Sequence, residues 1–104
     1  MQHYVLSVEE GSQLGKSYLL NQDVVTIGRV TGSADIGLGD RTMSPVHARF
    51  IRLGTGTYGI EDLRSANGTF LNGQAVPLGA IYPLQDGDRL ALGDVVLLFR
   101  KQAE

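Results

Sequence analysis

Residues 57–73, with the sequence TYGIEDLRSANGTFLNG, contain the pattern that decides the fold class. Two segments rich in β-branched and aromatic residues, Thr57–Leu63 and Thr69–Leu71, are separated by Asn67-Gly68, and the second is followed by Asn72-Gly73. Asn-Gly pairs adopt the positive φ angles of tight turns. The stretch therefore predicts two strands, each followed by a turn, as in an antiparallel sheet.

Turn-forming residues recur along the whole chain. It contains fourteen glycines and three prolines, and the longest stretch free of both, Lys16–Ile27, leaves little room for a helix. Turn residues also stand at Asp86-Gly87 and Gly93-Asp94. Many short strands at close spacing predict a β-sandwich or barrel. The six further predicted strands are Tyr4–Val8, Ser17–Leu20, Val24–Ile27, His47–Leu53, Arg89–Leu92 and Val95–Phe99.

The segment Val30–Val46 contains few strand-forming residues. We predict that it is a long surface loop of the kind that carries function on a rigid scaffold.

The composition excludes several classes of protein. A chain of 104 residues has room for one domain with one core, so residues 1–104 are expected to form a single domain. A net charge of -2 with 19% charged residues argues against binding to nucleic acid or to an anionic membrane. The longest apolar run, Val95–Phe99, is far shorter than a membrane helix. With no cysteine and no signal-peptide pattern, the chain is expected to be cytoplasmic.

Several polar residues stand in the predicted turns. Arg29 follows one predicted strand, Ser44 and His47 lie three positions apart before another, and Asn67 lies in the turn described above. Loops of a sandwich gather at its ends. An arginine, a hydroxyl group and an amide that converge there would suit a phosphate ester on an extended peptide.

Taken in order, these pieces resemble the forkhead-associated (FHA) family. The resemblance implies an all-β, two-sheet antiparallel sandwich of about eleven short strands with its binding loops at one end. It also implies a non-enzymatic signalling module that binds phosphothreonine in a partner protein downstream of a serine/threonine kinase. FHA domains are often joined to other domains, so this chain could be a module of a longer protein. The matching motifs are Thr26-Ile27-Gly28-Arg29, Asp35-Ile36, Ser44-x-x-His47-Ala48, Asp62-Leu63-x-Ser65-x-Asn67-Gly68-Thr69, Asn72-Gly73 and Leu84-x-x-Gly87-Asp88.

The resemblance assigns roles to the matching positions. Arg29 and Ser44 would contact the phosphate, and Asn67 would hydrogen-bond the main chain of the ligand. His47 would brace the loops. Gly28 and Gly68 would supply the backbone shapes that present their neighbours.

Pro45 departs from the family pattern. The family commonly has arginine, lysine or asparagine after the motif serine, whereas proline offers neither a charged side chain nor an N–H group. Arg41 and Arg64 are candidates to replace the missing contacts. The alternative is a degenerate FHA domain that mediates phosphate-independent protein interaction or assembly.

Other patterns carry less weight. Ser44 and His47 could in principle serve a hydrolase, but no nucleophile-elbow motif is present. The spacing of Gly54-x-Gly56-x-x-Gly59 matches the glycine pattern of dinucleotide-binding motifs, but these glycines lead into a predicted strand and not a helix, so a hairpin is expected. Residues 11–17 resemble a P-loop but have one residue too few between the glycines, and they lead into a predicted strand, so a turn is expected. The two histidines, His3 and His47, are too isolated to indicate a metal site, and no cofactor is expected.

Overall fold

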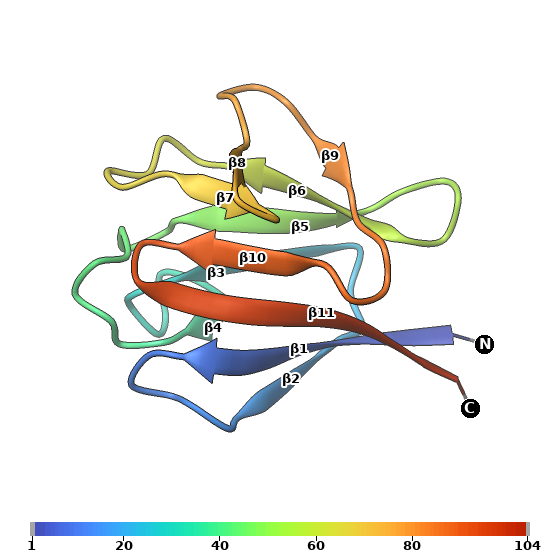
Figure 1. Cartoon of the computed structure of the whole chain (residues 1–104), viewed down its shortest axis with the longest axis horizontal. Helices are drawn as coiled ribbons and strands as arrows, with labels where there is room; N and C mark the ends of the chain where they lie inside the picture. The colour runs from blue at the N-terminus through green and yellow to red at the C-terminus, as the bar shows by residue number, and fades with distance from the viewer. Residues whose placement is uncertain (1, 104) are drawn as a thin grey trace.

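The computed structural model describes residues 2–103, which form eleven β-strands in two facing sheets (Figure 1). The six-stranded sheet has the order β2-β1-β11-β10-β7-β8, and the five-stranded sheet has the order β4-β3-β5-β6-β9. All neighbouring strands are antiparallel except β3 and β4. The strands are β1 (Gln2–Glu10), β2 (Ser17–Leu20), β3 (Val24–Gly28), β4 (Ile36–Gly37), β5 (Ala48–Arg52), β6 (Tyr58–Asp62), β7 (Thr69–Leu71), β8 (Gln74–Ala75), β9 (Tyr82–Pro83), β10 (Arg89–Leu92) and β11 (Val95–Ala103).

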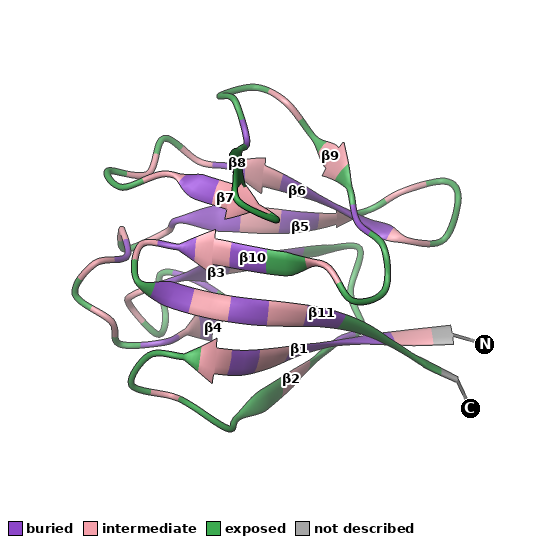
Figure 2. Ribbon diagram, in the orientation of Figure 1, coloured by how far each residue is buried: buried purple, intermediate pink, exposed green. Residues whose placement is uncertain are grey.

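The core lies between the sheets. Inward-facing residues alternate with outward-facing ones, and this alternation appears as purple and pink bands along β11 in Figure 2. Phe50 from one sheet and Phe99 from the other are fully buried. Tyr4 stacks on Phe99 with ring centroids 5.0 Å apart and meets Tyr58 edge-on at 5.8 Å. Aromatic and aliphatic side chains from both sheets thus fill a single core.

The predicted all-β sandwich is confirmed, and each of the eight predicted segments contains a strand. The sequence did not predict β4, β8 and β9, which have two residues each. Two residues are too few to show a period of two, so only their pairing with neighbours defines them.

The predicted turns are confirmed at two hairpins. Leu71 pairs with Gln74, so Asn72 and Gly73, at φ 49° and 85°, form a two-residue turn. Gly93 and Asp94 likewise connect the last two strands, with Gly93 at φ 60°. The dinucleotide-like and P-loop-like segments connect β5 to β6 and β1 to β2, so neither opens a helix.

The prediction for Val30–Val46 was partly wrong. The segment does connect strands at the molecular surface, but it contains β4, and four of its side chains are buried: Ala34, Ile36, Leu38 and Met43. Three of these occupy alternate positions, so they anchor the segment in the core as a strand would. Among the described residues there is no apolar helix of membrane-spanning length.

Candidate functional site

Three loops meet at the end of the sandwich opposite the chain termini, on the left in Figure 1. They connect β3 to β4, β4 to β5 and β6 to β7. Between them lies a hollow of about 280 Å³, and four of the sequence-predicted residues line it: Arg29, Arg41, Ser44 and Asn67. Thr42, Met43, Pro45 and Ala66 complete its wall.

Arg64 lies elsewhere. It lines a second hollow, of about 340 Å³, together with Leu63, Leu78 and Gly79. Residues 63–67 form a common wall, because Leu63 and Arg64 face this hollow whereas Ala66 and Asn67 face the first. The structure therefore brings Arg41, but not Arg64, together with Arg29.

Arg29 is held by main-chain groups of the next loop. Its backbone N–H donates to the carbonyl of Ser44 at 3.0 Å, and its Nε donates to the carbonyl of Met43 at 3.2 Å. Within residues 2–103, no protein acceptor engages its two terminal amino groups. The guanidinium therefore keeps two amino groups, with four N–H donors, for a ligand.

Ser44 is oriented by an N–H of the β6–β7 loop. Its Oγ accepts a hydrogen bond from the N–H of Ala66 at 2.9 Å. Because a hydroxyl both accepts and donates, this contact leaves its proton available to an oxygen atom in the hollow.

His47 is fully buried behind these loops. Its Nδ1 accepts from the N–H of Ser44 at 3.1 Å, so the ring proton resides on Nε2, which donates to the carbonyl of Gly68 at 2.9 Å. Burial, which outweighs that hydrogen bond and the charge of Asp62, lowers the pKa of His47 below 6.5. A neutral His47 thus connects the loop of Ser44 to the turn of Asn67.

The same contacts argue against a hydrolase. Main-chain groups occupy both ring nitrogens of His47, and the Ser44 hydroxyl interacts with Ala66 instead. A histidine base must bond to the nucleophile's own hydroxyl, so this pair lacks the arrangement that activates a serine.

Asn67 is fixed from the opposite side of the hollow. Its Nδ2 donates to the carbonyl of Thr42 at 2.8 Å. The Thr42 hydroxyl donates to Oδ1 of Asp40 at 2.6 Å and accepts from the N–H of Asp94 at 2.8 Å. Since no described residue engages Oδ1 of Asn67, this oxygen and the second amide hydrogen remain for a peptide main chain.

Asp62 organises the turn that presents Asn67. Its carboxylate accepts hydrogen bonds from the N–H and hydroxyl of Ser65 and from the Thr69 hydroxyl, and Ser65 Oγ accepts from the N–H of Gly68. Burial opposes ionisation of Asp62, but the hydrogen bonds outweigh it and lower the pKa of the carboxyl below 3.8.

The sequence alone did not indicate roles for Asp62, Ser65 or Thr42. Asp62 and Ser65 belong to the motif that ends in Asn67-Gly68-Thr69, so that motif could have indicated them. Thr42 belongs to none of the quoted motifs.

The glycines act through shape. A Cβ on Gly28 would lie 2.2 Å from the carbonyl oxygen of Pro45, so only glycine allows β3 to approach that loop. Gly68 has a φ of 85°, in the region that favours glycine. Pro45 itself is exposed at the hollow's rim.

The electrostatics of the hollow favour an anion. Arg29 and Arg41 line it, and no carboxylate does. Asp40 stands nearby, but its carboxylate accepts the hydroxyl and N–H of Thr42, contacts that lower the pKa of Asp40. Two guanidinium groups, a hydroxyl and a carboxamide therefore line one small hollow.

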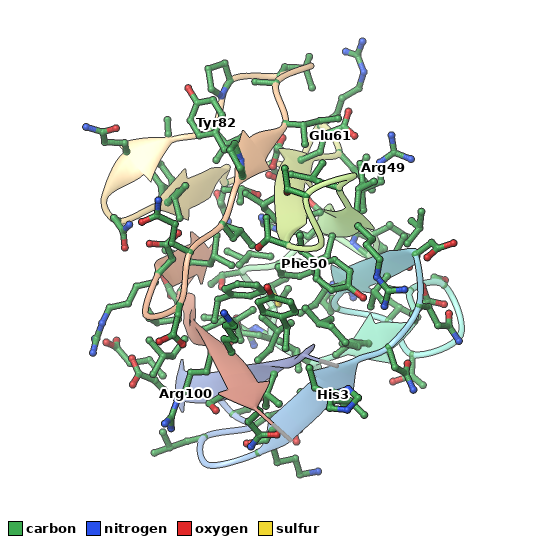
Figure 3. The ribbon with its side chains drawn as sticks, turned by 90° about the vertical axis from the view of Figure 1, so that its right-hand side faces the viewer. His3, Arg49, Phe50, Glu61, Tyr82 and Arg100 are labelled. Atoms are coloured by element: carbon green, nitrogen blue, oxygen red, sulfur yellow. The ribbon has the colours of Figure 1, made fainter. Side chains whose placement is uncertain are left out.

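A larger hollow, of about 630 Å³, lies at the other end of the sandwich, beside His3, which is labelled in Figure 3. Its cation, Arg52, donates to Asp23 at 3.1 Å and to the Tyr58 hydroxyl at 2.9 Å. Because the Arg52 guanidinium already has protein partners, this larger hollow is the weaker candidate for an anion site. The size of a hollow therefore does not identify the binding site. Within residues 2–103, no group of three or more histidine, aspartate or glutamate side chains could hold a metal ion.

Comparison with known proteins gave a family and several relatives. Residues 25–93 match the family model of the FHA domain. The chain is 38% identical over 95 residues to the oxoglutarate dehydrogenase inhibitor of Corynebacterium glutamicum, with 91% of this chain and 63% of that protein covered. It is 37% identical over 95 residues to the glycogen accumulation regulator GarA of Mycolicibacterium smegmatis, with 91% and 57% covered. The chain thus spans less than two-thirds of these relatives.

Solved structures agree with the fold. The FHA domain of the CT664 protein from Chlamydia trachomatis is 27% identical, with a TM-score of 0.87 and coverage of 97% of this chain and 99% of that one. A structure from a study of phosphothreonine-dependent FHA domain interactions is 29% identical, with a TM-score of 0.83 and coverage of 98% and 99%.

Proposed function

Because the chain belongs to the FHA domain family, we propose that it binds a phosphothreonine-containing segment of a partner protein in the hollow between Arg29, Ser44 and Asn67. The observation that carries this proposal is the convergence of these three side chains, from three separate loops, with their ligand-facing donors free. Its relatives are named as a regulator and an inhibitor, which is in keeping with a signalling role in place of catalysis.

Each side chain has a distinct role in the proposed complex. The terminal amino groups of Arg29 bind phosphate oxygens, and the Ser44 hydroxyl donates to another. Asn67 hydrogen-bonds the peptide main chain beside the phosphothreonine, and its bond to Thr42 holds it in place. Arg41, exposed on the rim, adds positive potential.

The proposal places the chain downstream of a serine/threonine kinase, in the cytoplasm. It involves no cofactor, nucleic acid or membrane insertion. Arg64 does not line the same hollow as Arg29, so in this proposal it contacts only residues of the partner that lie beyond the phosphothreonine.

The decisive experiment is a titration of the chain with a phosphothreonine peptide library and its unphosphorylated copy, followed by fluorescence anisotropy. We expect binding of phosphorylated peptides only. Arg29→Ala should weaken binding by about tenfold or more, because charge-assisted hydrogen bonds contribute about 1.5–3 kcal/mol each. Arg100→Ala, on the exposed end of β11, is the matched control and should leave affinity unchanged. Equal binding of both libraries would contradict the proposal.

Pro45 supports a second candidate, a phosphate-independent interaction domain. It lines the hollow without an N–H to donate. If the second candidate is correct, a partner captured from the cell stays bound after phosphatase treatment, and Arg29→Ala leaves that capture unchanged. If the first is correct, Pro45→Asn raises phosphopeptide affinity, because it adds an N–H and a carboxamide at the rim.

A further inference from the structure

The phosphate contacts proposed above leave the second hollow unused. Its volume is about 340 Å³, and its walls come from the β6–β7 connection and from the connection between β8 and β9, with Leu63, Arg64, Leu78 and Gly79 among them. Residues 63–67 form the wall that it shares with the first hollow. The second hollow therefore continues the proposed binding surface on the other side of that wall.

Arg64 has an unusual backbone conformation for its residue type. Its φ is 56°, in the left-handed region that L residues other than asparagine and aspartate seldom adopt. The turn enforces this angle, because the Asp62 carboxylate accepts a hydrogen bond from the N–H of Ser65, the residue after Arg64. Non-glycine residues held in this region are typical of functional sites.

The charges around the second hollow leave the Arg64 guanidinium unpaired. Glu61 accepts a hydrogen bond from Nε of Arg49 at 2.7 Å, and the Asp62 carboxylate accepts hydrogen bonds within its own turn. Arg64 is exposed, and among residues 2–103 no hydrogen bond or ion pair engages its guanidinium. A carboxylate from outside the chain can therefore bind Arg64 without displacing a protein partner.

Exposed apolar side chains lie in the β8–β9 connection, at the top of the molecule in Figure 1. Leu78, which lines the second hollow, is 57% exposed, and Ile81 is 44% exposed. Ile81 lies over Gly59 of β6, because a Cβ on Gly59 would be 2.6 Å from Cγ2 of Ile81. Glu61, two residues along the same face of β6, also lines the hollow. Apolar surface is thus available beside the unpaired guanidinium.

We propose that the second hollow binds one apolar side chain of the partner together with an adjacent carboxylate, and so selects phosphothreonine segments in which an apolar residue precedes an acidic one. This inference rests on the proposed function, because the phosphothreonine in the first hollow holds the segment in place. The apolar side chain packs against Leu63 and Leu78, and the carboxylate accepts from Arg64. A volume of about 340 Å³ is near the lower end of ligand pockets, about 300–1,000 Å³, so it suits one large side chain.

The test uses phosphothreonine peptides in which alanine fills every other position except for one Leu-Glu pair. The pair is moved one position at a time along both sides of the phosphothreonine, and each peptide is titrated by fluorescence anisotropy. Two matched series carry Leu-Gln and Ser-Glu instead. We expect the Leu-Glu pair to raise affinity about five- to tenfold over the all-alanine phosphopeptide at one or two neighbouring positions, and each matched pair to raise it less.

Variants assign this preference to the two side chains. Arg64→Gly should bind Leu-Glu and Leu-Gln peptides equally, and it should fold like wild type because glycine adopts a φ of 56° without strain. Arg64→Glu should prefer Leu-Lys to Leu-Glu. Leu78→Ser should reduce the preference for leucine over serine. Leu19→Ser, at a similarly exposed leucine on β2, is the matched control and should keep the wild-type preference.

The outcomes separate this inference from the proposed function. If phosphothreonine peptides bind through Arg29 but the Leu-Glu pair has no effect at any position, only the role of the second hollow is overturned. The same conclusion follows if the full preference persists in both Arg64→Gly and Leu78→Ser. If no phosphothreonine peptide binds in any series, the proposed function is wrong, and the role of the second hollow is overturned with it.

Discussion

His47 and Gly28 do not line the hollow, yet they position residues that do. The buried imidazole accepts from the N–H of Ser44 and donates to the carbonyl of Gly68, so its protonation state affects two loops at once. Gly28 acts through the absence of a side chain, because Pro45 occupies the space where a Cβ would lie. Both effects can be measured without a ligand.

We predict that stability falls as the pH drops below about 6.5. The folded-state pKa of His47 is lowered, so the unfolded chain takes up the proton more readily in this range. The contribution is fully present above the unfolded value of 6.5 and is lost as the pH falls towards the folded value. Urea unfolding between pH 8 and pH 5 measures it, without interference from the peptide phosphate, whose own pKa is about 6.

His47→Gln is the control for this pH dependence. Asp62 does not interfere, because its lowered pKa contributes stability that is lost only below 3.8. If the variant retained the wild-type slope between pH 5 and pH 7, another group would be responsible.

Gly28→Ala should destabilise the fold by about 1–3 kcal/mol or more, because the new methyl group overlaps the Pro45 carbonyl. Gly54→Ala is the matched control, since no atom lies within 4 Å of its Cβ position and its φ is not positive. Chemical denaturation of the two variants measures the difference. Equal stability would mean that the Pro45 loop moves aside at little cost, and phosphopeptide affinity would then report that movement.

At the scale of elements, β6 and the loop after it show how a strand positions a site. Glu61 points outward and pairs with Arg49 at 2.7 Å, near each other in Figure 3, whereas Asp62 points inward and accepts from Ser65 and Thr69. The alternation of the strand thus directs one carboxylate to a partly buried ion pair on the outer face of the sheet and the next to the turn that carries Asn67.

Asp62→Asn should therefore weaken phosphopeptide binding, although Asp62 does not line the Arg29 hollow itself. It should also lower the free energy of unfolding by at least about 1.5 kcal/mol, because an amide replaces a carboxylate that accepts several hydrogen bonds. Glu61→Gln weakens a partly buried ion pair on the outer face of the sheet but keeps a side-chain oxygen that can accept from Arg49, so it should cost less than Asp62→Asn, about 1 kcal/mol, with no change in affinity. Denaturation and anisotropy titration of both variants provide the comparison. Full affinity in a folded Asp62→Asn variant would show that the turn does not need the carboxylate.

At the scale of the whole molecule, the two sheets share one core, and the site loops extend from it. Met43 and Leu38 are buried while their neighbours Ser44 and Arg41 reach the hollow, so the loops are fixed by the same packing that holds the sheets together. A substitution that removes core packing should therefore lower the free energy of unfolding. Ligand binding should fall only to the extent that the fraction of folded protein falls.

Phe99→Ala should lower the free energy of unfolding by about 3–5 kcal/mol, because Phe99 is fully buried and stacks on Tyr4. Its neighbour Leu98 points to the outer face and is only partly buried, so Leu98→Ala should cost much less. Thermal or urea unfolding checks both. Similar losses in the two variants would contradict the assignment of inner and outer faces on β11.

Much of the architecture could be predicted from local patterns. Asn72-Gly73 and Gly93-Asp94 marked hairpins because their backbone angles depend on the residues themselves, and alternation in segments such as Tyr4–Val8 marked strands with one buried face. The two-residue β4, β8 and β9 were not predicted because two residues are too few to show alternation, so only their pairing with β3, β7 and β6 defines them.

The candidate site divides in the same way. The residue types at Arg29, Ser44 and Asn67 and their order along the chain came from the sequence alone, as did the resemblance to FHA domains. Only the tertiary structure decided that Arg41 shares their hollow while Arg64 faces another, and that Asp62 and Thr42 brace the loops. The reason is physical: turn and strand preferences act between near neighbours, whereas the direction of a loop side chain depends on contacts with loops 20 or more residues away, such as the bond from Ala66 to Ser44.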